Sequence, residues 1–249
     1  MSANEVLTLI TGSDKGIGFE TAKELAKAGQ HVLIGARNQV RGESAVQAIR
    51  EAGGQADFVQ LDVTNADQVQ AAAKQIQADY GHLNVLINNA GIAADAHQKP
   101  SELSIDLIQQ DFAVNFFGLI RVTQAMVPLL RAGQPAKIIN VTSNMGSFGL
   151  ATDPNSRFYQ VSSLGYQASK AAANFATVDF AKELADEGIT VNSVNPGWTA
   201  TGFGGRDESK PAIPGMQSVA EGAAQIIKLA LSTDQTTGTF TENAGKLPW

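Results

Sequence analysis

The segment Tyr166-Gln-Ala-Ser-Lys170 contains two residues that could transfer a proton. On a helix, a lysine four residues after a tyrosine lies one turn away on the same face. Tyrosine is a weak acid with a reference pKa of about 10, and a nearby positive charge lowers the pKa of its phenol toward neutral pH. Ser143 precedes Tyr166 by 23 residues and offers a second hydroxyl. The pair predicts an acid for a carbonyl oxygen or a base for an alcohol, although many solvated helices carry Tyr and Lys at this spacing.

A glycine-rich segment, Thr11-Gly-Ser-Asp-Lys-Gly-Ile-Gly18, directly follows the first apolar run and opens a helical pattern. Glycines there permit a tight turn and let the backbone approach a pyrophosphate, which the helix N-terminus attracts. The spacing Gly-x3-Gly-x-Gly differs from the Gly-x-Gly-x-x-Gly fingerprint and lacks the Gly-Lys-Ser/Thr end of a Walker loop. An ordinary glycine turn has the same composition, but the strand–turn–helix context predicts a dinucleotide site.

The choice of dinucleotide depends on the charge at the end of the second apolar run. An acidic residue there would hold a ribose 2′-hydroxyl, whereas an arginine accommodates a 2′-phosphate. The chain has Arg37 and no acid at positions 34–38, and Lys15 adds a positive charge from the glycine loop. Each could be a simple solvated base, but together they predict NADP(H).

Short apolar runs alternate with longer amphipathic segments, an order that predicts a parallel sheet covered by helices. The expected fold is α/β, a doubly wound Rossmann-type parallel sheet of about seven strands with helices on both faces. We expect one domain over residues 1–249, with residues 199–217, rich in Gly and Pro, as a substrate lid. The expected strands are Val6–Ile10, His31–Gly35, Asp57–Leu61, Val85–Asn88, Lys137–Val141 and Thr190–Val194, with Phe240 in a seventh. The expected helices are Gly18–Ala28, Val40–Ala52, Ala66–Tyr80, Ile105–Leu130, Gly165–Glu187 and a last one opened by the capping box Ser218-x-x-Glu221.

The composition excludes several classes of protein. The chain has 249 residues, 43% of them hydrophobic, and a net charge of −6, so nucleic acid is not an expected partner. It has no cysteine, and its three histidines, His31, His82 and His97, are not spaced for a metal site. Without a basic, apolar leader or 18 consecutive apolar residues, it is expected to be cytoplasmic and not bound to membrane.

In order along the chain, the glycine loop, Asn88-Asn-Ala-Gly91, Asn115, Ser143 and the Tyr166/Lys170 pair resemble the short-chain dehydrogenase/reductase family. The resemblance runs from about Val6 to Leu231. Lys15, Arg37, the pair Arg41-Gly42 and the closing Pro248-Trp249 are further similar to the cytosolic NADPH-dependent carbonyl reductases.

The resemblance implies a role for each matched position. Ser143 would bind the substrate oxygen, Tyr166 would be the general acid, Lys170 would lower the pKa of Tyr166 and bind the nicotinamide ribose, and Asn115 would hold a water in a proton relay. Asp62 would contact adenine, and Asn88 would lie at the adenosine ribose. The implied cofactor-binding residues are Gly12, Lys15, Gly16, Ile17, Gly18, Arg37, Asp62, Val63, Asn88, Ala90, Gly91, Tyr166, Lys170, Pro196, Gly197, Thr199 and Thr201.

The chain departs from the family pattern between Ser143 and Tyr166. The family serine commonly precedes the tyrosine by about a dozen residues, whereas Ala151–Ser163 adds roughly ten more here. This polar insertion is expected to shape the substrate mouth and to affect a homo-oligomer, a dimer or tetramer, formed through the helices at 105–130 and 165–187.

Four large apolar residues follow Ser143 or the Pro196-Gly197 turn and are candidates for a substrate wall as well as for core packing. They are Met145, Phe148, Trp198 and Phe203. They predict reduction of a neutral, apolar ketone, aldehyde or quinone. An NADP-dependent alcohol, polyol or steroid dehydrogenase is the alternative on the same scaffold, and a non-catalytic dinucleotide-sensing regulator is the alternative from another class.

Overall fold

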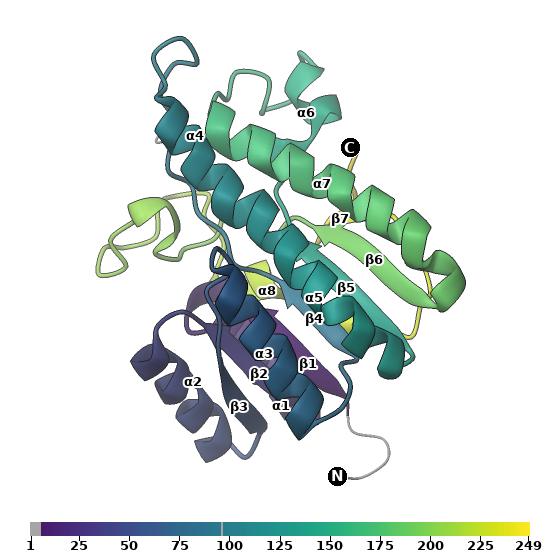
Figure 1. Cartoon of the computed structure of the whole chain (residues 1–249). Helices are drawn as coiled ribbons and strands as arrows, with labels where there is room; N and C mark the ends of the chain where they lie inside the picture. Colours follow the sequence, from purple (N-terminus) through teal and green to yellow (C-terminus); the bar gives the residue numbers. More distant parts are fainter. Residues whose placement is uncertain (1–5, 96) are drawn as a thin grey trace.

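The computed structural model describes residues 6–95 and 97–249. Its centre is a sheet of strand order β3-β2-β1-β4-β5-β6-β7-β8, in which every pair is parallel except β7 with β8 (Figure 1). The expected doubly wound parallel fold is confirmed, and the short antiparallel β8 extends it beyond the predicted seventh strand. The strands are β1 Leu7–Thr11, β2 His31–Ala36, β3 Gln55–Gln60, β4 Val85–Asn88, β5 Ala136–Val141, β6 Ile189–Val194, β7 Phe240–Glu242 and β8 Gly245–Lys246.

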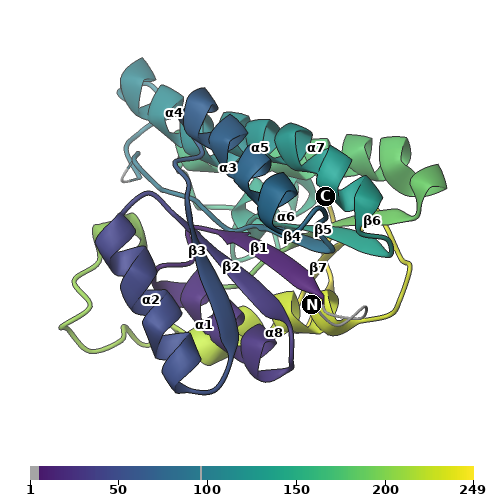
Figure 2. The ribbon, with the colours of Figure 1, turned by 60° about the horizontal axis from the view of Figure 1, so that its bottom comes forward.

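Helices cover both faces of this sheet (Figure 2). Helices α1, α2 and α8 share one apolar core with the sheet, and α3, α5 and α7 share the other. The main helices are α1 Gly16–Lys27, α2 Gln39–Glu51, α3 Ala66–Asp79, α4 Ile105–Phe112, α5 Leu119–Ala132, α6 Phe148–Thr152, α7 Leu164–Leu184 and α8 Val219–Leu231. Helix α8 begins with the expected capping box, because Ser218 and Glu221 each bond the other's backbone N–H.

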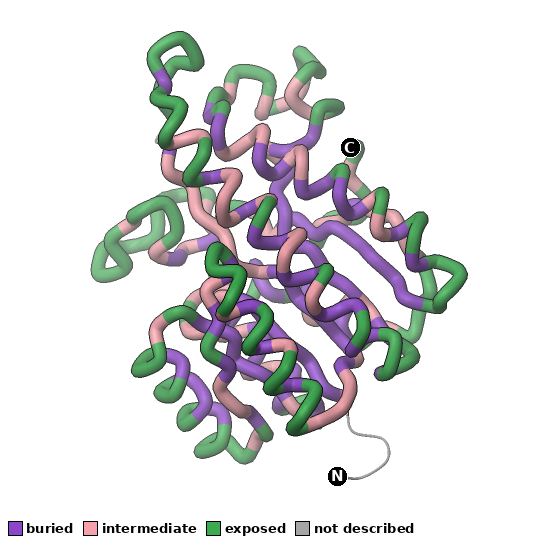
Figure 3. The backbone as a smooth tube through the Cα atoms, in the orientation of Figure 1, coloured by how far each residue is buried: buried purple, intermediate pink, exposed green. Residues whose placement is uncertain are grey.

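The apolar runs became strands because both of their faces are covered. Every residue of β1, β4 and β6 is buried, and the burial colouring shows this buried layer between helices with exposed outer faces (Figure 3). A strand buried on both faces needs a continuous apolar run rather than an alternating one.

The strand order places a crevice at the carboxyl edge of the sheet. Strand β1 pairs with β2 on one side and with β4 on the other, so the connections that leave β1 and β4 turn to opposite faces. A doubly wound sheet binds ligands at this switch point. The glycine loop after β1 and residues 88–91 at the end of β4 both reach it.

The expected helix over Ile105–Leu130 is not one continuous α-helix. A π-helical turn, Ala113–Gly118, separates α4 from α5 and contains Asn115. Single π turns occur mostly at functional sites, where they redirect a side chain without ending the helix. By length and composition, the stretch Ile105–Ala132 is also apolar enough to cross a membrane. In this fold, however, half of its most apolar 18-residue part is buried, and it packs against the core.

Candidate active site

The glycine loop has the shape of a phosphate cradle. Gly12 and Gly16 adopt positive φ angles of 64° and 58°, which side chains disfavour. A Cβ on Gly18 would stand 2.4 Å from the Asn89 amide nitrogen, so this position has no room for one. Lys15 is the N-cap residue of α1 and offers no side-chain oxygen to its first N–H groups. Those N–H groups can therefore bind a phosphate, and the loop fits a dinucleotide.

Two residues that the sequence analysis did not assign fasten this loop to the end of β4. The Thr11 hydroxyl oxygen accepts hydrogen bonds from the backbone N–H groups of Asn89 and Ala90, both at 3.0 Å. The Asn89 amide donates to the carbonyl oxygens of Thr11 at 2.8 Å and Gly12 at 3.0 Å. Asn89 lies inside the Asn88–Gly91 motif, so its position in the sequence could have indicated this role. The glycine loop and residues 88–91 thus form one rigid surface, which is called the floor of the crevice below.

Asn88 itself turns its side chain away from the crevice. It is buried, and its amide nitrogen donates to the Thr123 hydroxyl at 3.0 Å and to the Asn140 side-chain oxygen at 2.9 Å. Its side chain therefore ties β4 to α5 and β5, and only its backbone can face an adenosine ribose. Ala90 and Gly91 continue along the floor, where a Cβ on Gly91 would lie 3.3 Å from the Lys170 nitrogen.

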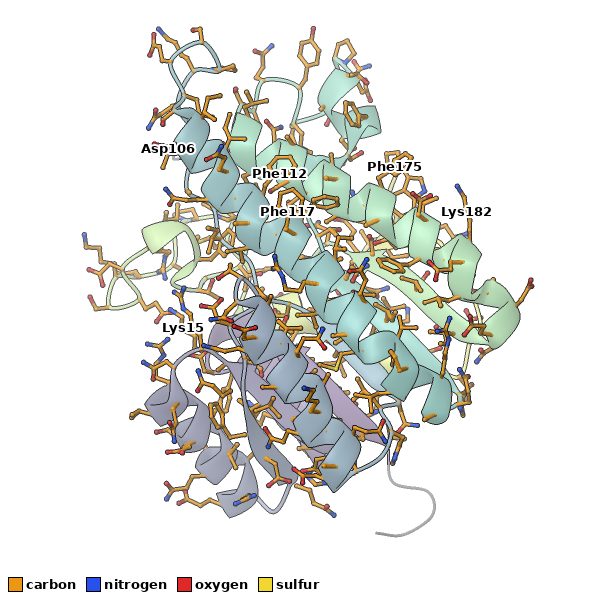
Figure 4. All side chains as sticks on the ribbon, in the orientation of Figure 1. Lys15, Asp106, Phe112, Phe117, Phe175 and Lys182 are labelled. Atoms are coloured by element: carbon orange, nitrogen blue, oxygen red, sulfur yellow. The ribbon has the colours of Figure 1, made fainter. Side chains whose placement is uncertain are left out.

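At the adenosine end, basic side chains gather beyond β2. Arg37 is exposed immediately after the strand, and Lys15 is exposed in the glycine loop (Figure 4). Arg41, on α2, pairs with Asp14 of the glycine loop, with 2.6 Å between Nε and Oδ2. The turn after β3 brings Asp62 and Val63 to the same edge, and Thr64 holds the Asp62 carboxylate through two hydrogen bonds of 2.9 and 2.7 Å.

The residues with catalytic potential meet beside this floor. Ser143 follows β5, and Tyr166 and Lys170 lie in the first two turns of α7. The Lys170 ammonium donates to the Val141 carbonyl oxygen at 2.9 Å and lies 5.9 Å from the centre of the Tyr166 ring. Three distant segments of the sequence thus bring two hydroxyls, one ammonium and the Asn115 turn to one place.

Asn115 is held firmly by its neighbours. Its side-chain oxygen accepts from the Ile92 N–H at 2.9 Å, and its amide donates to the Ile92 carbonyl and to the Ser169 hydroxyl, each at 2.9 Å. The side chain therefore joins the π turn to the loop after β4 and to α7. This arrangement fixes where Lys170 stands relative to the floor.

The electrostatics of the pair differ from the sequence-based expectation. Loss of solvation raises the pKa of Tyr166 to about 12, although the Ser143 hydrogen bond lowers it, and the charges of Asp111 and Asp95 raise it further. Burial lowers the pKa of Lys170 to about 8, against the opposing charge of Asp111. Desolvation thus outweighs the lysine charge, and within the protein alone Tyr166 keeps its proton at neutral pH.

The residues predicted to bind the nicotinamide lie in the turn after β6 and at the start of the segment 199–217. Thr199 and Thr201 are buried, and the Thr201 methyl carbon lies 3.5 Å from the place of a Cβ on Gly16. The Thr199 hydroxyl donates to the Gly197 carbonyl at 3.1 Å, and the Gln217 amide donates to the Pro196 carbonyl. The turn after β6 therefore faces the glycine loop across the crevice.

The segment 199–217 is closed at its base and carries Phe203 over the catalytic residues. Thr199 and Gln217 form a β-bridge, and Gln217 donates its N–H to the Trp198 carbonyl at 2.9 Å. The Phe203 ring packs edge-on against Tyr166, with 5.7 Å between ring centroids. Of the other wall candidates, Met145 is half-buried, while Trp198 and Phe148 are mostly exposed.

The segment that follows Ser143 is held by the end of the chain. The Ser147 hydroxyl donates to the Pro248 carbonyl at 2.7 Å, and the Gly149 N–H donates to the Trp249 carbonyl at 2.8 Å. The Trp249 ring stacks on Phe240 of β7, 5.5 Å away. Residues 248–249 thus fix the entrance to the insertion and leave the Trp249 ring against β7 rather than over the crevice.

Among residues 6–95 and 97–249, no group of three or more His, Asp or Glu side chains could hold a metal ion.

Comparisons with known proteins agree with this geometry. A short chain dehydrogenase family model matches residues 7–212. The chain is 35% identical over 247 residues to the short-chain dehydrogenase anuI of Penicillium roqueforti, covering 97% of this chain and 92% of that protein. It is 33% identical to the 3-oxoacyl-[acyl-carrier-protein] reductase FabG of Thermotoga maritima, covering 92% of this chain and 90% of that one.

Solved structures show the same architecture. An NADPH-bound carbonyl reductase from chicken fatty liver superposes with a TM-score of 0.84 at 25% identity, covering 99% of this chain and 100% of that one. A gluconate 5-dehydrogenase from Burkholderia cenocepacia, in complex with NADP and tartrate, gives a TM-score of 0.81 at 28% identity, covering 96% and 94% of the two chains. With the glycine loop, the Asn88–Gly91 turn and the Ser143, Tyr166 and Lys170 cluster all in place, the chain belongs to the short-chain dehydrogenase/reductase family of oxidoreductases.

Proposed function

We propose that this protein reduces a neutral, apolar ketone, aldehyde or quinone to the alcohol, with NADPH as the hydride donor and Tyr166 as the general acid. The observation that carries the proposal is the convergence of the Ser143 and Tyr166 hydroxyls and the Lys170 ammonium beside a glycine loop shaped for phosphate. The two hydroxyls can donate to one carbonyl oxygen, which gains negative charge during reduction.

NADP(H) fits the charges of the adenosine end. Lys15, Arg37 and Arg41 surround the edge at which a 2′-phosphate would lie, and positions 34–38 carry no acid. The relatives solved with NADPH or NADP support the same cofactor. Gly12, Gly16 and the first N–H groups of α1 would hold its pyrophosphate. When bound, the cofactor supplies the hydride.

The protein's own groups would handle the proton. Tyr166 releases its proton to the substrate oxygen, and the Ser143 hydroxyl donates a hydrogen bond to the same oxygen. Lys170 stabilises the tyrosinate that forms, and its ammonium can return a proton to the phenol oxygen. Asn115 bonds the hydroxyl of Ser169, the residue before Lys170, and so holds the π turn against α7.

The raised pKa of Tyr166 favours reduction over the oxidising alternative. A tyrosine with a pKa near 12 enters the reaction as an acid at neutral pH, whereas alcohol oxidation needs tyrosinate at the start. A dinucleotide-sensing regulator has no use for the three converging groups, all of which are present.

The walls favour an apolar substrate. Two arginines near the site could clamp a carboxylate, but each is otherwise engaged. Arg206 donates to the carbonyl oxygens of Lys210 at 2.7 Å and Pro211 at 3.0 Å. Arg157 stacks over the Phe158 ring at 4.8 Å. Met145, Phe203 and Trp198 are the apolar side chains left to define the mouth.

The test is consumption of NADPH and of NADH by the purified protein against a panel of ketones, aldehydes, quinones and charged keto acids. The proposal predicts NADPH-dependent turnover that is highest with bulky neutral carbonyls. Turnover only in the oxidising direction would favour the alcohol dehydrogenase alternative, and cofactor binding without any turnover would favour the regulator.

A further inference from the structure

The helix that carries Tyr166 is capped by a carboxylate from a distant loop. Asp95, in the loop after β4, accepts hydrogen bonds at Oδ2 from the N–H groups of Gly165 at 2.9 Å and Tyr166 at 3.3 Å. Its Oδ1 accepts from the Ser163 hydroxyl at 2.5 Å. Ser163 is the N-cap residue of α7, yet its hydroxyl bonds Asp95 rather than the helix. The side chain of Asp95 is buried, with 1% of the residue exposed.

A second buried carboxyl lies beside the first. Asp111 on α4 accepts from the Ala94 N–H at 2.8 Å, and its Oδ2 has no hydrogen-bond partner among the residues that the structure describes. A Cβ on Gly165 would lie 2.7 Å from Asp111 Oδ2 and 3.5 Å from Asp95 Cβ. Only glycine at this position of α7 lets both carboxyl groups approach the helix.

The two carboxyl groups have different surroundings. Asp95 receives three hydrogen bonds, each of which stabilises a carboxylate. Asp111 receives one, and burial together with the charge of Asp95 raises its pKa. Asp95 is therefore the more fully hydrogen-bonded of the two carboxyl groups, and it is the one that bonds the start of α7.

We propose that Asp95 is a positioning residue for Tyr166. The carboxylate of Asp95 fixes the first turn of α7 and keeps the Tyr166 phenol protonated until hydride transfer. The inference rests on the proposed reduction by NADPH. A carboxylate at a helix N-terminus offsets the positive end of the helix dipole. Without it, the uncompensated dipole would stabilise tyrosinate and weaken the hold on the proton.

Other charged and polar groups approach Tyr166 from β5, from α4 and from its own helix. Ser143 reaches it from β5, Lys170 from its own helix and Asp111 from α4, while the lid presents the apolar Phe203. Asp95 differs from these groups because it accepts a hydrogen bond from the backbone N–H of Tyr166.

The same carboxylate fastens the insertion before α7. Its bond to Ser163 holds the last residue of the insertion, and the ring of the neighbouring His97 contacts the Ser162 carbonyl at 3.0 Å. The loop after β4 thereby joins the substrate mouth to the catalytic helix. A change at Asp95 should reach both kcat and the substrate KM, whereas NADPH binding should stay intact.

The test compares Asp95→Asn with Asp111→Asn, two isosteric changes of which only the first removes a carboxylate bonded to the start of α7. For Asp95→Asn we expect kcat for ketone reduction to fall about tenfold and the alkaline limb of its pH profile to move to lower pH by about one unit, with the Kd for NADPH unchanged. Asp111→Asn leaves those bonds in place and should move the alkaline limb less. Asp95→Glu retains the charge and should restore the limb.

A uniform loss of kcat in Asp95→Asn with an unmoved alkaline limb would show a merely structural cap and overturn the inference. An equal or larger shift in Asp111→Asn would also overturn it, because the effect would then come from any nearby carboxyl group and not from the bonds of Asp95 to the helix. The chain has three tyrosines, so NMR of protein labelled with ¹³C at the tyrosine ring can follow Tyr166 directly, with Tyr166→Phe for assignment. This titration needs no turnover, and it separates failure of the inference from failure of the proposed function.

Discussion

Phe203 lies edge-on against Tyr166, with their ring planes at 63° and their centroids 5.7 Å apart. Phe203 belongs to the segment 199–217, which is closed at its base by the Thr199–Gln217 bridge and contains Gly204, Gly205 and Gly215 at positive φ. We expect this ring to shield the phenol and to offer apolar contact to a substrate. We expect the segment to move as a unit about those glycines.

Phe203→Ala should therefore raise the KM for an aryl ketone by about tenfold, because an apolar contact worth roughly 1–3 kcal/mol is lost. Steady-state kinetics with an aryl ketone and a keto acid of similar size measure the effect. Ile213→Ala, at a similarly exposed position of the same segment, is the matched control and should change little. A higher kcat/KM for the keto acid in the wild type would contradict the apolar wall and implicate Arg157 or Arg206.

Arg37→Asp should shift cofactor preference from NADPH toward NADH. A charge-assisted contact to the 2′-phosphate would be replaced by repulsion, while an acid at this position can accept from the ribose 2′-hydroxyl. The ratio of kcat/KM for the two cofactors should change by at least about 100-fold. Lys27→Asp makes the same charge change on an exposed residue at the far end of α1 and should leave the ratio unaltered. Equal use of both cofactors by the wild type would show that the charge argument is wrong.

The buried ammonium of Lys170 costs stability while it is charged. Its pKa is lowered from 10.5 to about 8, so the folded protein loses this proton at lower pH than the unfolded chain does. The cost is fully present below pH 8 and disappears as pH rises from 8 to 10.5. Lys170→Met should thus be more stable than the wild type at pH 7, by at most about 3 kcal/mol before the lost bond to Val141 is counted.

Denaturant unfolding of both proteins across this pH range measures the difference, which should shrink toward alkaline pH. Lys182→Met, at an exposed position of the same helix, should show no such pH dependence (Figure 4). A stability difference for Lys170→Met that stays constant from pH 7 to 10 would refute the assigned cause.

The outer side of the α4, α5 and α7 layer carries exposed aromatic rings. Phe117 is 53% exposed and packs on the partly buried Phe112, and Phe175 of α7 is 67% exposed (Figure 4). Helix α6 and the insertion, which begins in its last turn, lie toward the N-terminal end of α7 and leave the middle of this face open (Figure 1). We expect a homo-oligomer through this face.

Phe175→Asp should then dissociate it to the 26.1 kDa chain, as measured by light scattering. Val40→Asp, an equally exposed apolar position on α2, is the control. A wild type that scatters as a 26.1 kDa monomer at all concentrations would end the proposal.

The sequence predicted the sheet, the order of its elements and the converging residues because each is encoded locally. Continuous apolar runs marked buried strands, and the motif spacings marked the turns at their carboxyl ends. The prediction for the helix over 105–130 missed the π turn at Asn115, since its apolar pattern runs on through α4 and α5 and the one glycine there, Gly118, does not distinguish a π turn from a continuous helix.

Contacts between distant segments could not be predicted in the same way. The pairing of Asp95 with the first turn of α7 joins residues 70 positions apart and has no local pattern. The Tyr166 pKa was predicted from the lysine alone, but the fold adds desolvation and two carboxyl groups, which act in the opposite direction. Such effects depend on burial, which spacing does not specify.

Tyr166→Phe tests the central claim most directly, because it removes the proton donor and keeps the ring against Phe203. With NADPH and a neutral aryl ketone, we predict that turnover falls by at least about 1000-fold while the Kd for NADPH and the melting temperature stay near the wild-type values. Turnover within a few-fold of the wild type would contradict the assignment of Tyr166 as the general acid.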